Sequence, residues 1–436
     1  MDVFLKNGHV VYAEDGHFRV ERRDLYIKGG KISGGYPEGG AMHEINCDGK
    51  VIMPGLVNAH HHIYSTLSKG IPCETPFNNF LGNLENLWWR LDRSLTEEDM
   101  MLSTALTMDD CLKNGVTTVF DHHISVPFIE NSLSKMAEVF DKYGVQGALA
   151  FEVSDRNGKD VFERSLAENL RFAKKNKDGN VKGMLGMHAS FTLSDESLKK
   201  MAEQSGDLPI HIHVGEDVWD EEHCRKVYGK SILARLDEFG LLRKNSLLVH
   251  CSNLDEEELE ILKGKPVFVA QAVDSNMNNG LNAADIHKLW EAGIASVTGT
   301  DGMHSSVLKA LKNSFLMLKF QNRNADIGFG EMESMLWQMY KLKMDWGFDL
   351  GINEGDEADV VVFDYIPATV LNTDTFLGHF IYGITETKAQ YVVKGKEFPL
   401  FDNELMIDPY DELKRKAPGI SRKLFKRVEQ TGRREE

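Results

Sequence analysis

The sequence is poor in several features that mark other classes of protein. Its 436 residues include only five cysteines, which are dispersed and never form a Cys-x-x-Cys pair, so neither a disulfide framework nor a cysteine-based zinc knuckle is expected. Eleven prolines are too few for a long proline-rich linker. No run approaches about 18 consecutive apolar residues, and the first residues carry no basic segment of the signal-peptide type. We therefore expect a globular protein of the reducing cytoplasm, without a membrane partner.

Basic charge is also scarce. Lysine and arginine number 50 against 67 aspartates and glutamates, which gives a formal net charge of −17. This balance disfavours nucleic acid or an anionic membrane as a partner held by bulk electrostatics. The hydrophobic share of 42% is typical of a folded protein, and the length exceeds what one core requires, so we expect at least two packed units.

The spacing of apolar residues predicts alternating strands and helices from Val51 onward. One helix begins at a capping box formed by Thr96 and Asp99. The strand-like runs are VIMPGLVN, VTTVFDHH, GVQGALAF, VKGMLGMH, LPIHIHV, SLLVHCS, PVFVAQAV and IASVTGTD. Other expected helices span residues 131–143, 160–175, 195–204, 222–239 and 306–320. Eight such alternations favour an α/β fold with a closed (β/α)8 TIM-type barrel, which takes roughly 250 residues.

Both ends of the chain differ from this pattern. The first fifty residues are rich in short strands, and the segments ADVVVFDY and AQYVVKGKEF are again strand-like. We expect residues 1–53 and 350–412 to form one composite β-domain beside a barrel of residues 54–349. Residues 413–436 are basic and predict a helix and tail, for which a solvated surface helix is preferred over a partner-binding segment.

Sixteen histidines are the unusual feature of the composition, and many follow the predicted strands. In a barrel of this type the active site lies where the strands end. A single histidine there would more often be a packing or surface residue, but imidazoles or carboxylates at six of eight strand ends favour a metal site. His60 and His62 leave the same face of a strand, while His61 points away. The set His60, His62, His213 and Asp301 leaves one position open for water, as in a catalytic ion site.

These motifs together resemble one known superfamily. They are the segment Pro54–Tyr64 with three consecutive histidines, His213-x-x-Glu216, His250-Cys251, Ser275–Asn279 and Gly299-Thr300-Asp301. The combination resembles the amidohydrolase superfamily, in particular its cytosine, guanine and atrazine-type aminohydrolases, and most of all the SsnA-type aminohydrolases. The resemblance covers nearly the whole chain. It implies a composite β-sandwich made from the two terminal segments, and one divalent metal ion, zinc in preference to iron.

The resemblance also implies catalytic roles. Asp301 would take a proton from the metal-bound water, His250 would orient that water, and Glu216 would carry the proton to the leaving group. This agrees with general chemistry, because a metal ion lowers the pKa of water and two carboxylates in different environments can divide acid and base roles. The alternative for Glu216 is a helix-capping or solvated carboxylate. The fourth strand ends in His188 and not in a lysine that could bridge two ions, so a mononuclear site is expected.

The sequence also suggests which residues would bind the substrate. The resemblance places His188 against the substrate, although a packing role is equally compatible with the sequence. Trp88 could stack on a flat ring together with Trp89, but such aromatics are more often part of a core. Relatives acting on guanine-like rings often have glutamine where Ser65 stands, and Asn-Pro where Ala272-Val273 stands. The full set of expected binding residues is His188, Trp88, His123, Ser65, Gln271 and His304.

The leading hypothesis is a metal-dependent deaminase that acts on a small nitrogen heterocycle and releases ammonia. The alternatives are a ring-amide hydrolase or chlorohydrolase on the same scaffold, and a noncatalytic metal- or metabolite-binding protein. Glu216 and His250 favour an enzyme, because a binding protein has no use for a proton carrier. A nucleic-acid deaminase is disfavoured by the net charge and by the absence of a cysteine-rich ligand motif. A homodimer is the assembly to test first; the sequence does not determine it.

Overall fold

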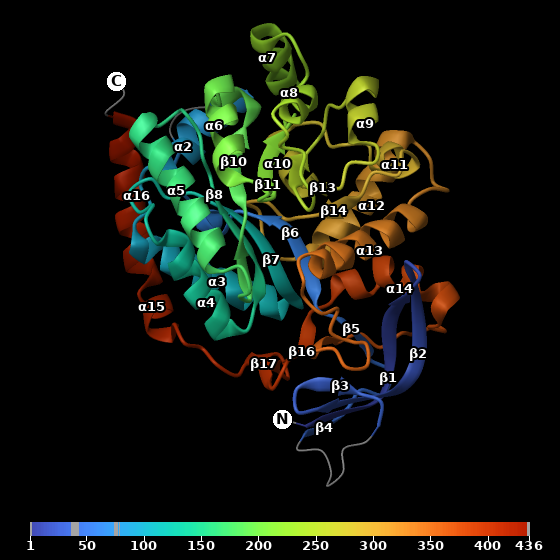
Figure 1. The fold of residues 1–436 in the computed structure, drawn as a ribbon. Helices are drawn as coiled ribbons and strands as arrows, with labels where there is room; N and C mark the ends of the chain where they lie inside the picture. Colours follow the sequence, from blue (N-terminus) through green and yellow to red (C-terminus); the bar gives the residue numbers. More distant parts are fainter. Residues whose placement is uncertain (1, 36–42, 74–76, 78, 434–436) are drawn as a thin grey trace.

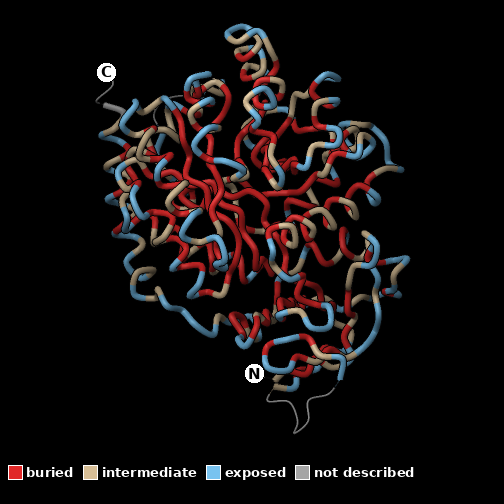
Figure 2. Tube along the Cα trace, viewed as in Figure 1, coloured by how far each residue is buried: buried red, intermediate tan, exposed pale blue. Residues whose placement is uncertain are grey.

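The computed structural model describes residues 2–35, 43–73, 77 and 79–433. Parallel strands fill the centre of the molecule in two sheets, and nearly all of their residues are buried (Figure 1; Figure 2). One sheet contains β6 (Leu56–His61), β7 (Val116–His123), β8 (Gln146–Phe151) and β9 (Val181–Gly183). The other contains β10 (Leu185–Ala189), β11 (Ile210–Val214), β12 (Leu247–His250), β13 (Phe268–Gln271) and β14 (Ser296–Thr298). The predicted α/β class with parallel strands is therefore confirmed.

Two isolated bridges connect the edges of these sheets. His61 at the end of β6 pairs with Asp301 just after β14, and Val153 just after β8 pairs with Met187 in β10. Both bridges are parallel, like the strands they follow. The carboxyl ends of β6 and β14 therefore lie next to each other although some 240 residues separate them in the sequence.

Two of the predicted strands are wrong as single strands, because the structure divides each of them into two. The run VIMPGLVN is divided at Gly55: β5 (Val51–Pro54) joins another sheet and only Leu56 onward belongs with the parallel strands. A Cβ atom on Gly55 would lie 2.0 Å from Thr117 Oγ1, so no other residue fits this crossing. The run VKGMLGMH is likewise divided at Met184 into β9 and β10, which belong to different sheets.

Helices separate the parallel strands as expected. The predicted capping box begins α3 (Glu97–Lys113), where the Thr96 amide donates to Asp99 Oδ2 over 2.8 Å. The predicted helix 222–239 is wrong as a single element, because Gly229 has a φ of 71° and Ser231 caps a second helix. The helices are α4 (Ser132–Tyr143), α5 (Lys159–Lys175), α6 (Asp195–Ser205), α7 (Val218–Tyr228), α8 (Ile232–Glu238), α9 (Glu256–Leu262), α10 (Val273–Asn279), α11 (Ile286–Glu291), α12 (Val307–Asn322) and α13 (Phe329–Asp345).

Strands from both ends of the chain meet in a third sheet, at the lower right of Figure 1. β5 pairs in parallel with β1 and antiparallel with β15, which joins the N-terminal and C-terminal segments. The strands of this terminal sheet are β1 (Val3–Glu14), β2 (His17–Lys28), β3 (Lys31–Ser33), β4 (His43–Asn46), β5, β15 (Asp359–Phe363), β16 (Ala389–Lys394), β17 (Glu397–Phe401) and β18 (Glu404–Leu405). A helix not predicted from the sequence, α14 (Phe376–Tyr382), lies between β15 and β16 in the chain.

A buried ion cluster, here called the Asp359 cluster, ties the terminal sheet to the parallel strands. Asp359 Oδ2 lies 2.7 Å from Lys343 Nζ on α13 and 2.7 Å from Lys394 Nζ on β16, and it accepts a hydrogen bond from Thr117 on β7 over 2.9 Å. Burial lowers the pKa of Lys343 to about 8. Although burial alone would raise it, the two lysines hold the pKa of Asp359 at about 2.

The C-terminal segment contains α15 (Asp411–Arg415) and α16 (Ala417–Arg433), which contacts α2 (Trp89–Asp92) and α3. Its apolar residues Ile420, Leu424 and Val428 are buried. The polar side of the helix remains exposed, as predicted for a surface helix. Among the helices of the described ranges, none has the length and hydrophobicity needed to cross a bilayer.

Candidate active site

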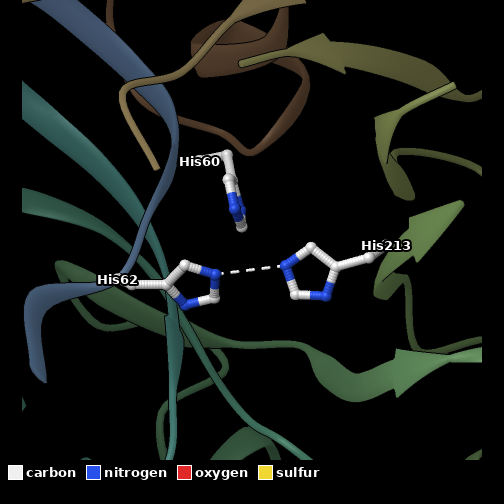
Figure 3. A group of neighbouring side chains, drawn as sticks. All are labelled: His60, His62 and His213. Carbon is white, nitrogen blue, oxygen red and sulfur yellow. Dashed lines mark hydrogen bonds between the residues drawn. The ribbon is translucent and has the colours of Figure 1, made fainter. Parts of the chain in front are cut away.

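Three histidines from two distant parts of the chain converge at the carboxyl ends of the parallel strands (Figure 3). His60 and His62 come from β6 and its end, and His213 comes from β11; one nitrogen of each lies within 4.8 Å of the others. The Nε2 atoms of His62 and His213 are 3.1 Å apart. Asp301 Oδ1 lies 3.4 Å from His62 Nε2 and 3.9 Å from His60 Nε2. The residues expected to hold a metal ion are therefore neighbours in space.

Backbone carbonyl groups determine which nitrogen of two histidines is protonated. His62 Nδ1 lies 2.7 Å from the carbonyl oxygen of His122, and His213 Nδ1 lies 2.8 Å from that of His188. A carbonyl oxygen can only accept, so both Nδ1 atoms donate, and in the neutral form of each ring this leaves Nε2 with a lone pair. Two facing lone pairs repel unless a cation lies between them, which fits a metal ion at this position.

The third histidine is held differently. His60 Nδ1 lies 2.8 Å from Nε2 of His211, a residue that the sequence analysis did not single out. His60 Nε2 is buried and has no hydrogen-bond partner among the described residues. Burial, reinforced by the neighbouring imidazoles, lowers the pKa of His60 and of His213 well below their usual range. Both side chains are therefore neutral at pH 7, the form that binds a metal ion.

Local backbone geometry brings Asp301 to the histidines. A Cβ atom on Gly299 would lie 2.6 Å from His60 Cβ, so glycine allows the segment after β14 to approach β6. Asp301 itself has a φ of 53°, and its carboxylate accepts from the Gly302 amide over 2.6 Å. His61 points to the other side of β6, where its Nε2 lies 3.2 Å from Ser305 Oγ, as the strand alternation predicts.

Glu216 and His250 stand beside this group. His250 Nε2 is 3.6 Å from Glu216 Oε2 and 3.8 Å from Asp301 Oδ2. Its Nδ1 lies 3.2 Å from Asn276 Oδ1, which orients the ring. Burial raises the pKa of Glu216 to about 7. For Asp301 burial also acts to raise the pKa, but His62 and His250 hold it below its usual range. The two carboxyl groups thus differ in protonation at pH 7.

A cavity that is partly open to solvent lies beside these side chains. Of the expected substrate-binding residues, His188 and Trp88 line it. The sequence analysis missed several polar lining residues; Glu152 follows β8 directly and could have been found by the strand-end rule. The lining residues are His62, Tyr64, Asn83, Leu84, Trp88, Trp89, Asp92, Glu152, Arg156, His188, His213, Glu216, His250, Ser275, Asn278, Asn279, Asp301, Gly302 and Met303.

The other four expected binding residues do not line this cavity. Each of three side chains has a polar partner within the protein, and the fourth, Gln271, is buried. Ser65 Oγ donates to the carbonyl oxygen of His62 over 2.7 Å. His123 Nε2 lies 2.9 Å from Ser125 Oγ, and His304 Nε2 lies 2.7 Å from Asp274 Oδ2. Ser65, His123, Gln271 and His304 are therefore absent from the lining of this cavity, and their contact with a substrate stays a prediction.

Comparison with known proteins gives one family and several relatives. Residues 51–396 match the model of the amidohydrolase family. A 5-methylthioadenosine/S-adenosylhomocysteine deaminase of Syntrophomonas wolfei is 27% identical over 431 residues, which cover 96% of each chain. A zinc-containing adenosine deaminase structure from Xanthomonas campestris has a TM-score of 0.81 at 20% identity, covering 98% of this chain and 99% of that one. Atrazine chlorohydrolase of Arthrobacter aurescens, complexed with zinc, has a TM-score of 0.79 at 19% identity, covering 96% and 100%.

Proposed function

Because the chain belongs to the amidohydrolase family, we propose that it is a metal-dependent aminohydrolase that removes an amino group from a small nitrogen heterocycle and releases ammonia. The observation that carries the proposal is the convergence of three imidazoles and Asp301 at the base of a cavity, beside a second carboxyl group with a raised pKa. The relatives named as deaminases support the reaction class.

The proposal includes the architecture of the two units. The parallel strands would form one closed (β/α)8 barrel, with β9 and β10 as one interrupted strand, and the two isolated bridges support this closure. The terminal sheet would fold into a composite β-sandwich of residues 1–53 and 350–412, beside the barrel of residues 54–349 and the tail of residues 413–436. The pairing of β5 with β15 supports this division.

The metal site would hold one divalent ion, zinc in preference to iron. Three imidazole nitrogens and one carboxylate oxygen are a donor set that zinc favours in catalytic sites, and the zinc-containing neighbours support this choice. When bound, such an ion lowers the pKa of water towards 7. In the described chain, His188 stands near the end of β10 where a bridging lysine would be needed for a second ion.

The protein's own groups would then move the protons. Asp301, with its low pKa, is ionised at pH 7 and accepts a proton from the attacking water. Glu216, with a pKa of about 7, can hold that proton and pass it to the leaving amino group or the adjacent ring nitrogen. His250 orients the attacking water through Nε2, because Asn276 holds the other ring nitrogen.

The competing functions make different predictions. A chlorohydrolase would release chloride and a ring-amide hydrolase would open the ring, whereas a noncatalytic protein would bind metal without turnover. The similarity to atrazine chlorohydrolase is the reason to test for chloride release, although at 19% identity it shows only a shared fold. The deaminase relatives aligned along 96% of the chain favour ammonia release.

Ammonia release from the zinc-loaded protein, measured over purines, pterins and triazines, tests the proposal. Replacing Glu216 by glutamine should abolish turnover and leave the zinc content unchanged, because Glu216 is not a ligand. Glu222→Gln, which changes an exposed residue of α7, is the matched control and should behave as wild type. No ammonia release from any compound of the panel, or full activity in Glu216→Gln, would refute the proposal.

Location and assembly are part of the same proposal. A cytoplasmic enzyme is supported by the five cysteines, all of which are free thiols. A homodimer remains the assembly to test, by light scattering of the purified protein.

A further inference from the structure

The segment that carries Glu216 is held by hydrogen bonds that the chemistry described above does not use. Gly215, the residue before Glu216, follows β11 directly and has a φ of 52°, a left-handed conformation that favours glycine. A Cβ atom on Gly215 would meet nothing within 4 Å, so the glycine serves the backbone conformation and not close packing. The direction of the Glu216 side chain therefore depends on how the backbone groups of Gly215 are held.

The amide of Gly215 is held by a buried carboxyl group. Asp220 Oδ2, on α7, accepts a hydrogen bond from this amide over 3.1 Å, and Asp220 is only 1% exposed. An acidic residue at this third position of a helix often accepts from the amide of the capping residue, which here is Asp217. The Asp220 carboxyl group instead reaches two residues further back, to the residue that precedes Glu216. Burial raises the pKa of Asp220 well above its usual range, which favours its neutral form.

The carbonyl group of Gly215 is held from the other side. Asn253 Nδ2 donates to this oxygen over 3.0 Å, and the Ser252 amide donates to it over 3.3 Å. Both residues lie just after His250, the last residue of β12. One backbone carbonyl group thus joins the loop that carries Glu216 to the loop that follows His250.

The loop after His250 is also tied to the ring of His250. Asn276 Oδ1 lies 3.2 Å from His250 Nδ1, and Asn276 Nδ2 donates to Ser252 Oγ over 3.2 Å. Asn276 therefore holds the side chain of His250 and the loop behind it in one arrangement. We call this set of contacts the Gly215 frame; it consists of Gly215, Asp220, Ser252, Asn253 and Asn276.

Building on the proposed function, we propose that the Gly215 frame holds Glu216 at the distance from His250 that proton transfer to the leaving group requires. Glu216 Oε2 lies 3.6 Å from His250 Nε2, and a displacement of about 1 Å at a reacting group can lower a rate by about 100-fold. Asp220 and Asn253 are absent from the cavity lining, so they act through Glu216 as positioning residues. In this role Asp220 must accept a hydrogen bond and Asn253 must donate one.

Asn253→Asp tests the donor with little change of shape. It places an acceptor against the Gly215 carbonyl oxygen, while its other oxygen can still accept from Asn282 Nδ2. In the zinc-loaded protein, on the compound that releases ammonia fastest, kcat should fall at least about tenfold and KM should change less than about threefold. Asn324→Asp, an exposed change of the same kind that keeps an acceptor for the Asp326 amide, is the matched control and should change neither constant.

Two variants of Asp220 test the acceptor. Asp220→Asn keeps an acceptor for the Gly215 amide and should retain kcat within about threefold, whereas Asp220→Ala removes it and should lower kcat at least about tenfold. KM and the zinc content of the folded protein should stay near wild type in both. A role confined to the stability of α7 would lower the free energy of unfolding without this split between kcat and KM. Asn253 is only half-buried, so Asn253→Asp tests the inference even where Asp220→Ala does not fold.

A crystal structure of zinc-loaded Asn253→Asp gives a readout that does not depend on turnover. The distance between Glu216 Oε2 and His250 Nε2 should exceed that of the wild-type protein by about 0.5 Å or more. Wild-type kcat in Asn253→Asp, an effect on KM alone, or a loss of zinc would overturn this inference and leave the proposed function standing. If the wild-type protein releases ammonia from no compound, the proposed function is overturned and the crystallographic distance decides the role of the frame alone. An unchanged distance overturns the inference in either case.

Discussion

The Asp359 cluster and the histidine cluster at the strand ends are both buried and polar, but their groups are satisfied in different ways. In the Asp359 cluster one carboxylate oxygen faces two ammonium groups and a hydroxyl group, each within 2.9 Å, and the other, Oδ1, is buried without a hydrogen-bond partner in the described chain. Among the histidines, the Nε2 atoms of His62 and His213 face each other over 3.1 Å, and His60 Nε2 is unpartnered in the described chain. Burial of polar groups therefore does not by itself indicate function. The histidine cluster is distinguished by several metal-binding nitrogens that converge on one point.

The largest effect is expected at the histidines. His213→Ala should abolish zinc binding and reduce turnover by on the order of 10³-fold or more, because water then keeps its ordinary pKa. The free energy of unfolding of the metal-free protein should fall by about 1–3 kcal/mol, because the carbonyl group of His188 loses its buried hydrogen-bond partner. Metal analysis and urea unfolding check this, with the exposed His17→Ala as control. A His213→Ala variant that still bound zinc tightly would show that His213 is not a metal ligand, and the contrast with the Asp359 cluster would fail.

The opposite pattern is expected for the Asp359 cluster. Asp359→Ala leaves two buried ammonium groups without a counter-charge and should lower the free energy of unfolding by about 3–5 kcal/mol. The zinc content of the folded fraction should stay as in wild type. Asp364→Ala, which breaks an exposed pair with Lys50, should cost no more than about 1 kcal/mol. If Asp359→Ala lost zinc before it lost stability, the cluster would belong to the site.

A third change sharpens the comparison within the metal site. The Nδ1 partners of His62 and His213 are backbone carbonyl groups, but His60 depends on the side chain of His211. His211→Leu should weaken zinc affinity by about 10- to 100-fold in a chelator competition assay. His211→Gln, which keeps an acceptor, should restore most of it. Equal affinities in both variants would contradict an orienting role.

The smallest effect is the acid response of the Asp359 cluster. Its lysines hold the folded-state pKa of Asp359 at about 2, below the unfolded value near 3.8. A depressed carboxyl pKa contributes stability that is present above the unfolded pKa and is lost as the pH falls towards 2; here this amounts to about 2 kcal/mol. Urea unfolding between pH 5 and pH 2 should show a smaller acid loss in Asp359→Asn. Identical acid profiles would show that Asp359 does not titrate as described.

Much of the site could be predicted because the carboxyl ends of parallel strands lie at the same edge of the sheet. The alternation along β6 separates His60 and His62 from His61, and the structure shows this separation. The residues that line the cavity could not be predicted in the same way. Ser65 and His304 follow strands like the metal ligands, but each turns to a protein acceptor, and periodicity carries no information about such contacts.

The sequence by itself determined the elements and the chemistry at their ends, since propensity, capping and alternation act over a few residues. Only the tertiary structure decided which of these groups are left without a partner. Gly55 divides a continuous apolar run because Thr117 and Asp359 approach it from distant parts of the chain. Arg156 becomes part of the cavity because Asp92 and Glu152 meet there. Long-range packing controls hydrogen-bond satisfaction, and through it the location of the site.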